Sequence, residues 1–209
     1  TDPANSLDPY SPRILVLDEN DIFELPVQSR LALEGGWSIE VWVRMADEDA
    51  NDTIDDGDGG IVIQRRIIKD TAGTDIDVNY ELGVTAAEEP YVLFSYMEGG
   101  FTYTRQVIAE GVTLDHTAWT HLAGVYDAGN GELRIVVDGQ SEWSIPVNGF
   151  FPRPETIGNA HTEVGIGLAV LVDDLRIWGS SATDETIAGR MRQASIGDED
   201  ADPLDRVEL

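Results

Sequence analysis

One acidic stretch of the chain, DEDANDTIDDGDGG at 47–60, has residue types and spacing that could bind a cation. Its oxygen-bearing residues follow the start of a calcium loop, D-x-[DN]-x-[DN], and continue to the ninth and twelfth positions, at Asp47, Asp49, Asn51, Asp55 and Asp58. The match is partial, because position six is Asp52 instead of glycine and the last acid is the shorter aspartate. The stretch therefore predicts either a Ca²⁺ site or a solvated acidic loop.

A second acidic pair, Asp173 and Asp174, lies within the apolar stretch VLVDDLRIW. Adjacent residues of a regular strand point to opposite faces, so Asp173 is expected to share a face with Leu175 and Ile177 and to point inward. An ionised carboxylate turned toward a core is costly unless it is paired or coordinated. The pair therefore predicts a further Ca²⁺ site, or an aspartate held by backbone amides or by Arg176.

The carboxylates lack the spacing of a glycan hydrolase. Two acids acting from one strand face need alternate positions, as in E-x-D-x-x-E, and no predicted strand has that pattern. His116, His121 and His161 are possible bases, but no Gly-x-Ser-x-Gly or other nucleophile motif accompanies them. We therefore predict a protein that is not an enzyme. Two carboxylates brought together from different strands would be the exception, which spacing along the chain does not test.

Several aromatic residues could contact a sugar. Sugars pack their apolar faces on aromatic rings, while polar neighbours bond their hydroxyl groups. The segment NGFFPRPE at 148–155 joins paired aromatics to an arginine and prolines, which a plain connection would not need. The candidate ligand-binding residues are Phe150, Phe151, Arg153, Tyr96, Tyr103 and Trp143. The alternative for these rings is packing in the core or at its rim.

The charge of the chain narrows the choice of partners. Its 209 residues include 40 acidic and 13 basic side chains, a formal net charge of −27 at pH 7. A surface this negative repels phosphate backbones and anionic lipids, so we expect no nucleic-acid binding. Adaptation to saline surroundings would explain the excess, because salt screens self-repulsion. No apolar run approaches the roughly 20 residues of a membrane span, and no cysteine is present for disulfides or thiolate metal sites.

Alternating apolar and polar residues, divided by Gly, Asp, Asn and Pro clusters, predict an all-β antiparallel sandwich. Strands are expected at 14–18, 22–26, 37–45, 60–69, 79–84, 91–97 and 101–109, in a hairpin over 118–139 that turns at Asn130-Gly131, and at 141–147, 162–168 and 170–178. One helix is expected over 181–194, capped by Ser181 or Thr183. Residues 10–196 are predicted to form one domain, with linkers at 1–9 and 197–209. Because the chain opens with TDPANSLDP and not with Met, we expect neighbouring domains in a longer protein.

Six motifs resemble, in order and spacing, the laminin-G-like, concanavalin-A-like jelly rolls of prokaryotic surface proteins. They are WSIEVWVR (37–44), YELGV (80–84), WTHLAGVYD (119–127), GELRIVVDG (131–139), VGIG (164–167) and DDLRIW (173–178), followed by the predicted helix. The resemblance implies a two-sheet antiparallel jelly roll with one concave face, usually noncatalytic and often calcium-binding. It also implies a structural Ca²⁺ near the last strand and the N-terminal segment, which suggests Asp18 beside Asp173 or Asp174.

The residues and the resemblance together predict a noncatalytic, calcium-stabilised module for carbohydrate recognition or adhesion. Its expected location is outside the cell or at the cell surface, within a larger chain. The alternative is a structural spacer or a protein–protein interaction domain without affinity for glycans. A carbohydrate-binding module requires an accessible sheet face or loop rim with polar and aromatic residues. A spacer or protein-interaction domain would instead have a concave face filled by bulky side chains or an inserted loop.

Overall fold

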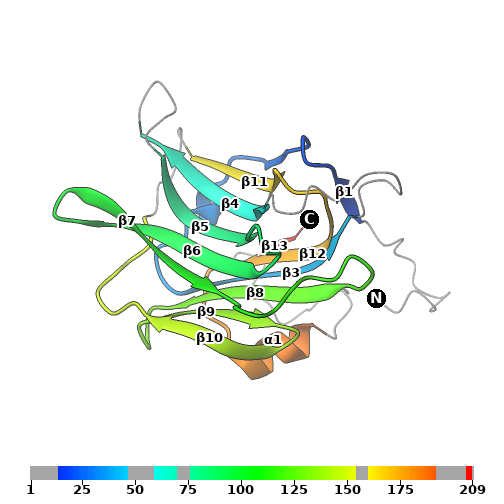
Figure 1. Cartoon of the computed structure of the whole chain (residues 1–209). Coiled ribbons are helices and arrows are strands. Elements are labelled where there is room, and N and C mark those ends of the chain that lie inside the picture. The colour runs from blue at the N-terminus through cyan, green and yellow to red at the C-terminus, as the bar shows by residue number, and fades with distance from the viewer. Residues whose placement is uncertain (1–13, 47–58, 70–75, 154–159, 192–205, 209) are drawn as a thin grey trace.

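The computed structural model describes residues 14–46, 59–69, 76–153, 160–191 and 206–208. The candidate calcium loop at 47–58 lies outside these residues. Two antiparallel sheets pack face to face in a jelly-roll sandwich, as predicted (Figure 1). Among the described residues, no helix has the length and hydrophobicity needed to cross a bilayer.

Each sheet combines strands from distant parts of the chain. Sheet A has the order β1 (Leu15–Leu17), β12 (Val170–Trp178), β3 (Trp37–Met45), β8 (Thr120–Asp127), β9 (Glu132–Val137) and β10 (Gln140–Pro146). Sheet B has the order β2 (Phe23–Leu25), β11 (Ala160–Ile166), β4 (Gly60–Ile68), β5 (Ile76–Val84), β6 (Pro90–Glu98) and β7 (Phe101–Ile108). A 3₁₀ turn, η1 (Ser29–Leu31), follows β2. The predicted strands are all present, with most bounds within two residues.

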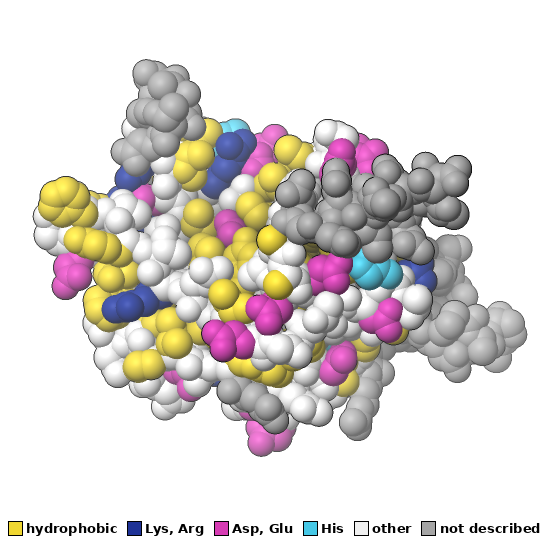
Figure 2. Space-filling view, in the orientation of Figure 1, with side chains coloured by type: hydrophobic (Ala, Val, Ile, Leu, Met, Phe, Trp, Pro, Cys, Tyr) yellow, Lys and Arg dark blue, Asp and Glu magenta, His cyan; other side chains and the backbone are white. Residues whose placement is uncertain are grey.

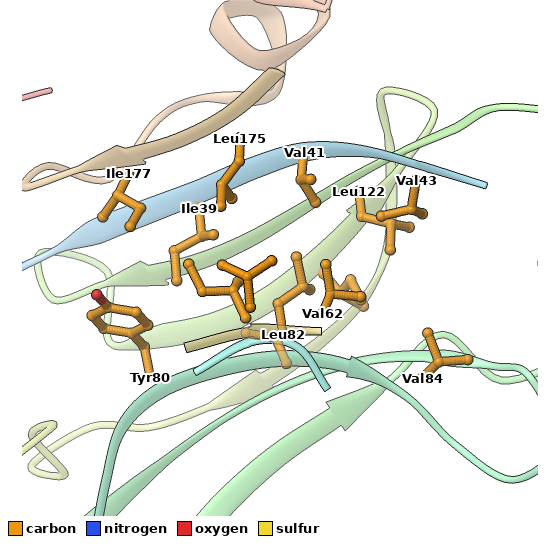
Figure 3. Packing of buried hydrophobic residues seen from close by; sticks show 14 of the residues in the cluster. Ile39, Val41, Val43, Val62, Tyr80, Leu82, Val84, Leu122, Leu175 and Ile177 are labelled. Atoms are coloured by element: carbon orange, nitrogen blue, oxygen red, sulfur yellow. The ribbon is translucent and has the colours of Figure 1, made fainter. Parts of the chain in front are cut away.

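The core lies between the sheets, where alternate residues of each strand meet. Ile39, Val41 and Val43 of β3 point toward the side chains of β5, among them Leu82 (Figure 3). Gly124 of β8 permits this close approach, because a Cβ there would lie 2.6 Å from Cγ2 of Val92 in the opposite sheet. The core thus fixes which face of each strand is left to point outward.

The turns of the 118–139 hairpin form as predicted. The Asp127 carboxylate accepts hydrogen bonds from the backbone N–H groups of Gly129 (3.0 Å) and Asn130 (3.1 Å). Gly131 adopts a φ of +64°. Asp138 closes the next turn with a φ of +48° and accepts a hydrogen bond from the His121 N–H at 2.9 Å. Turn formation therefore accounts for both aspartates.

A short helix, α1 (Asp184–Arg190), covers part of the outer face of sheet A. Thr183 is its N-cap and accepts a hydrogen bond from the Thr186 N–H, as predicted. Ile187 is fully buried and belongs to a small second cluster with Ala123, Val125, Val136 and Ala182. The helix is shorter than the predicted 181–194, and the side of sheet A that it covers is closed to large ligands.

The C-terminal tail differs from its prediction as a linker. Residues Arg206–Glu208 form β13, which pairs with Arg176–Trp178 of β12. β1 pairs with the other half of the same strand edge, at Val170–Val172. Segments from both ends of the chain therefore lie along one edge of sheet A.

Candidate functional site

A row of side chains crosses the outer face of sheet B from edge to edge. The strand register places six residues side by side, Glu24, Glu163, Gln64, Glu81, Leu93 and Gln106. Five of the six can form hydrogen bonds. We call all six residues the polar row. Neighbouring strands lie about 4.8 Å apart, so the row extends over roughly 24 Å.

One end of the polar row is held by ion pairs. Arg66 Nη2 lies 2.7 Å from Oε1 of Glu163, and Gln64 Nε2 donates to the other oxygen of that carboxylate at 3.3 Å. His161 Nδ1 lies 2.7 Å from Oε1 of Glu24. Glu163 is nearly buried, so Arg66 supplies the positive charge that such a carboxylate requires. The side chains at this end are fixed by one another before any ligand arrives.

The centre of the row is built around Glu81. Its Oε1 accepts a hydrogen bond of 2.6 Å from the Tyr91 hydroxyl. Burial raises the pKa of the Glu81 carboxyl, an effect only partly offset by that hydrogen bond. Burial and the nearby carboxylate also raise the pKa of the Tyr91 phenol, which stays neutral and donates. Tyr91 can lie across the sheet because residue 83 is glycine: a Cβ there would sit 2.5 Å from the Tyr91 oxygen.

Glu81 and Glu163 are carboxylates that different strands bring to one face. Their strands are two apart, which separates them by about 9.6 Å, near the upper limit for inverting glycosidases. Gln64 stands between them and donates to Glu163, while Arg66 and Tyr91 hold the two acids. Each carboxylate therefore faces a neighbouring side chain and not its counterpart, an arrangement suited to binding more than to hydrolysis.

Three of the predicted ligand-binding aromatics meet at one end of the sandwich. Tyr96 stacks on Tyr103 with ring centroids 5.6 Å apart, and Phe150 contacts Tyr96 at 4.5 Å. The sequence analysis missed Arg105, whose guanidinium lies 4.2 Å from the Phe150 ring centroid. We call these four residues the aromatic shelf. Hydrophobic side chains gather at this end of the molecule, with acidic and basic side chains next to them, on the left of Figure 2.

The other predicted ligand residues lie around the shelf or away from it. Phe151 is 60% exposed, beside the shelf residue Phe150. Arg153 is engaged in an ion pair, with Nη1 3.0 Å from the buried Asp77 carboxylate, which Lys69 also approaches at 2.9 Å. Trp143 is half-buried and packs against the main core. Core packing was the predicted alternative to sugar contact for these aromatic residues.

The prediction that Asp173 shares an inward face with Leu175 and Ile177 is wrong. A β-bulge between Asp173 and Arg176 shifts the register of β12 on β3, and Asp174 has a φ of +52°. Asp173 is thereby paired with Trp42, on the outer face, where burial raises the pKa of its carboxyl. Arg176 Nε donates a hydrogen bond to Asp174 Oδ1 at 2.9 Å. An aspartate held by Arg176 was the predicted alternative to a Ca²⁺ site.

Asp18 does not join these aspartates. It follows Leu17, which pairs with Val170, so about four residues of strand separate its position from that of Asp173. Its Oδ1 accepts a hydrogen bond from the Asn20 N–H at 2.9 Å, an Asx turn. The donor set therefore does not fit a Ca²⁺ shared by Asp18, Asp173 and Asp174. In the described part of the chain, no group of three or more His, Asp or Glu residues is arranged to hold a metal ion.

A buried polar cluster fastens α1 to the outer face of sheet A. Glu40 of β3 is 1% exposed, and its Oε1 lies 2.6 Å from Nη1 of Arg190 in the helix. The Arg190 guanidinium also lies 3.8 Å from the ring centroid of Trp178. Burial raises the pKa of Glu40 despite Arg190. Nearby His121 is buried, which lowers its pKa to about 4 and keeps it neutral. The cluster is structural, since the helix covers it.

The other histidines are also bonded to acids. His116 Nε2 lies 2.9 Å from Oε1 of Glu88, and His161 contacts the polar row through Glu24. Neither lies beside a serine or threonine hydroxyl that it would activate in any contact the structure gives.

Comparisons with known proteins agree with the fold. No curated protein matches the chain. Among solved structures, the carbohydrate-binding domain CBM40 of the Ruminococcus gnavus IT-sialidase, bound to α2,3-sialyllactose, is similar at 13% identity and a TM-score of 0.62, covering 84% of this chain and 95% of that one. The leech intramolecular trans-sialidase, complexed with 2,7-anhydro-Neu5Ac, is similar at 11% identity and a TM-score of 0.63.

The leech match covers 88% of this chain but only 28% of the enzyme. Domain 4 of AbnA, an extracellular arabinanase of Geobacillus stearothermophilus in complex with arabinotriose, is similar at 19% identity and a TM-score of 0.51, over 83% of this chain and 74% of that domain. At sequence identities this low, the structural similarity shows a shared fold alone. The family model of the concanavalin A-like lectin/glucanases superfamily matches residues 17–188, which span both sheets and most of α1. The chain therefore belongs to the concanavalin A-like lectin/glucanases superfamily.

Proposed function

We propose that this chain is a noncatalytic carbohydrate-binding module whose glycan lies along the polar row of sheet B. The observation that carries the proposal is the row itself: hydrogen-bonding side chains aligned by register across one sheet face. No described helix lies on that face, whereas α1 occupies the outer face of sheet A. The row offers donors and acceptors along a length sufficient for several sugar rings.

The chemistry of the row suits sugar hydroxyls. Glu24 and Gln106 are exposed and present acceptor and donor atoms, with the buried Gln64 and Glu81 between them. Existing bonds hold Glu24, Gln64 and Glu81 in place, which lowers the entropy lost on binding. Tyr91 and Leu93 add apolar surface beside the polar atoms, a combination typical of ligand sites. Sugars carry several hydroxyl groups on an apolar ring, so both features would be used at once.

The comparisons support this proposal. Two of the similar structures, the Ruminococcus gnavus domain and the Geobacillus domain, contain bound oligosaccharides. Both are parts of larger proteins, and the Geobacillus enzyme is extracellular. We extend to this chain a role in adhesion or in targeting neighbouring domains to a glycan, outside the cell or at its surface.

The experiment is a glycan binding screen followed by calorimetry. Arabinotriose and 3′-sialyllactose serve as first probes, and positive glycans are titrated against Gln106→Ala and His161→Ala. The matched control is Ser144→Ala, at an exposed position on sheet A. Both row variants should weaken binding about tenfold, and the control should bind like the wild type. A screen without glycan ligands would favour the spacer or protein-interaction alternative, and equal loss in the control would refute the row as the site.

We also propose, on the spacing of Asp47, Asp49, Asn51, Asp55 and Asp58, that Ca²⁺ stabilises the module through the 47–58 loop. Binding to the native state alone stabilises by mass action, by about 2.7 kcal/mol at 100 times the dissociation constant. Thermal melting in EDTA and then in millimolar CaCl₂, at fixed high NaCl, measures this effect. A calcium-specific rise that Asp55→Ala abolishes is expected, and unchanged melting would exclude a stabilising site.

A further inference from the structure

The aromatic shelf combines flat rings with a cation held in a fixed position. Arg105 lies over Phe150, with its guanidinium carbon 4.2 Å from that ring centroid, and 5.4 Å from the centroid of Tyr96. Phe150 is itself anchored, because its carbonyl accepts a hydrogen bond from the Tyr126 hydroxyl at 3.1 Å. Tyr103 stacks on Tyr96 and remains 46% exposed. The shelf thus presents an accessible ring beside a guanidinium whose orientation is fixed.

Arg105 differs from several arginines of this chain in that no described carboxylate pairs with it. Carboxylates pair with Arg66, Arg134, Arg176 and Arg190. Within the described ranges, no carboxylate lies at ion-pair distance from Arg105, and its buried Nε atom has no hydrogen-bond partner. Its guanidinium is therefore available to an acidic group of a ligand.

The charges next to the shelf do not replace that partner. Asp77 lies on β5, two strands from β7, and it is buried and compensated by Lys69 and Arg153. Thr102 of β7 also donates to it at 2.8 Å. Lys69 and Arg153 thus already neutralise this carboxylate, and it does not pair with Arg105. The guanidinium of Arg105 would itself attract a ligand that carries a negative charge.

We propose that the aromatic shelf is a second binding site, specific for a sugar that carries a carboxylate, such as a uronic or sialic acid. The planar guanidinium of Arg105 matches a carboxylate with two parallel N–H···O bonds. The exposed Tyr103 ring accepts the apolar face of the pyranose next to that carboxylate. A free carboxylate of a peptide would use Arg105 but would leave the Tyr103 ring without a flat partner. The site does not depend on the polar row, which lies on the opposite face of sheet B.

Paired probes test the proposal directly. Digalacturonate is compared with galactobiose, and 3′-sialyllactose with lactose, by calorimetry in 1 M NaCl and EDTA. The Debye length of about 3 Å then screens repulsion from the rest of the surface. At least one carboxylated sugar should bind about tenfold more tightly than its neutral counterpart. Which of the two does so separates a uronate from a sialylated ligand.

Variants connect that preference to the shelf. Arg105→Gln should remove the preference for the carboxylated sugar, Arg105→Lys should retain part of it, and Tyr103→Ala should weaken binding of that sugar. Thr104→Ala, at an exposed position of β7 adjacent to Arg105 but on the other face, should leave the preference unchanged. Circular dichroism melts confirm that each variant is folded. Equal binding of charged and neutral probes, no binding up to millimolar concentration, or an unchanged preference in Arg105→Gln would overturn the proposal. An acidic peptide that binds as tightly as the carboxylated sugar would overturn its assignment to sugars.

Discussion

The ion pair between Glu40 and Arg190 allows a quantitative prediction for Arg190→Ala. Glu40 is 1% exposed, and its Oε2 atom has no hydrogen-bond partner in the described structure. Without Arg190 its charge would stay buried and unpaired, which costs about 3–5 kcal/mol. The carboxyl can avoid part of this cost by taking up a proton. At pH 7, protonating a carboxyl whose unfolded pKa is about 4.3 costs roughly 2.7 × 1.36, or about 3.7 kcal/mol.

The cost of protonating Glu40 limits how much stability Arg190→Ala can lose and makes that loss depend on pH. Arg190→Ala should lower the free energy of unfolding by about 3–4 kcal/mol at pH 7, including a small contribution from the lost contact with Trp178. Because the variant raises the folded-state pKa of Glu40 further above its unfolded value, the folded state binds the proton more tightly. Stability is then greatest at low pH and is lost as pH rises from the unfolded pKa to the folded pKa. Moving from pH 7 to pH 5 should therefore restore up to about 2.7 kcal/mol relative to wild type.

Urea denaturation of wild type, Arg190→Ala and the double variant Glu40→Gln/Arg190→Ala measures these differences. The double variant should lose the pH dependence and recover part of the stability, since no buried charge remains. Glu185→Ala, an exposed position on the same helix, is the control and should change stability by less than about 0.5 kcal/mol. A loss below 1 kcal/mol in Arg190→Ala, or a loss that is the same at pH 5 and pH 7, would refute the reasoning.

Three further predictions use other features of the fold. Gly83→Ala places a Cβ 2.5 Å from the Tyr91 hydroxyl and 2.7 Å from the Gly60 carbonyl, so it should cost about 1–3 kcal/mol in urea denaturation and weaken glycan binding. Normal affinity in that variant would argue against a role for the central row. Thr183→Ala removes the N-cap of α1 and should cost about 1 kcal/mol, whereas Thr183→Ser should cost little. In EDTA, the melting temperature should rise from 0.1 to 1 M NaCl, as the Debye length falls from about 10 to 3 Å, and an unchanged value would contradict adaptation to salt.

Local patterns in the sequence predicted most of the fold. The bounds of β3 and β12 agree with the predicted ranges, because each strand carries alternating or continuous apolar residues between clear turn signals. The Asp127 turn was also predictable, since its hydrogen bonds join residues two and three positions apart. The error at Asp173 arose from the bulge, which adds one residue to β12 and reverses the alternation after it.

The candidate binding surfaces depend on information that the local pattern does not carry. Glu163 becomes a neighbour of Gln64 and Glu81 only through the register of β11 on β4, and β11 is far from β4 and β5 along the chain. The aromatic shelf was predicted in part, because Tyr96, Tyr103 and Phe150 were candidates for sugar contact, although Tyr96 is itself buried in the structure. Arg105 was missed because nothing next to it in sequence shows that Phe150, 45 positions away, provides the ring beneath it.

The pairing of β1 and β13 along one edge of β12 affects how the module could be joined to other domains. Leu15, where β1 begins, is opposite Val172, and Glu208, where β13 ends, is opposite Arg176. These two strand ends are therefore separated by about 13 Å along β12. A fold whose entry and exit points are this close can be inserted into a surface loop of a host domain without separating the two sides of that loop. Such an insertion would hold the module at a fixed angle through two connections, whereas a single tether between successive domains would let it rotate.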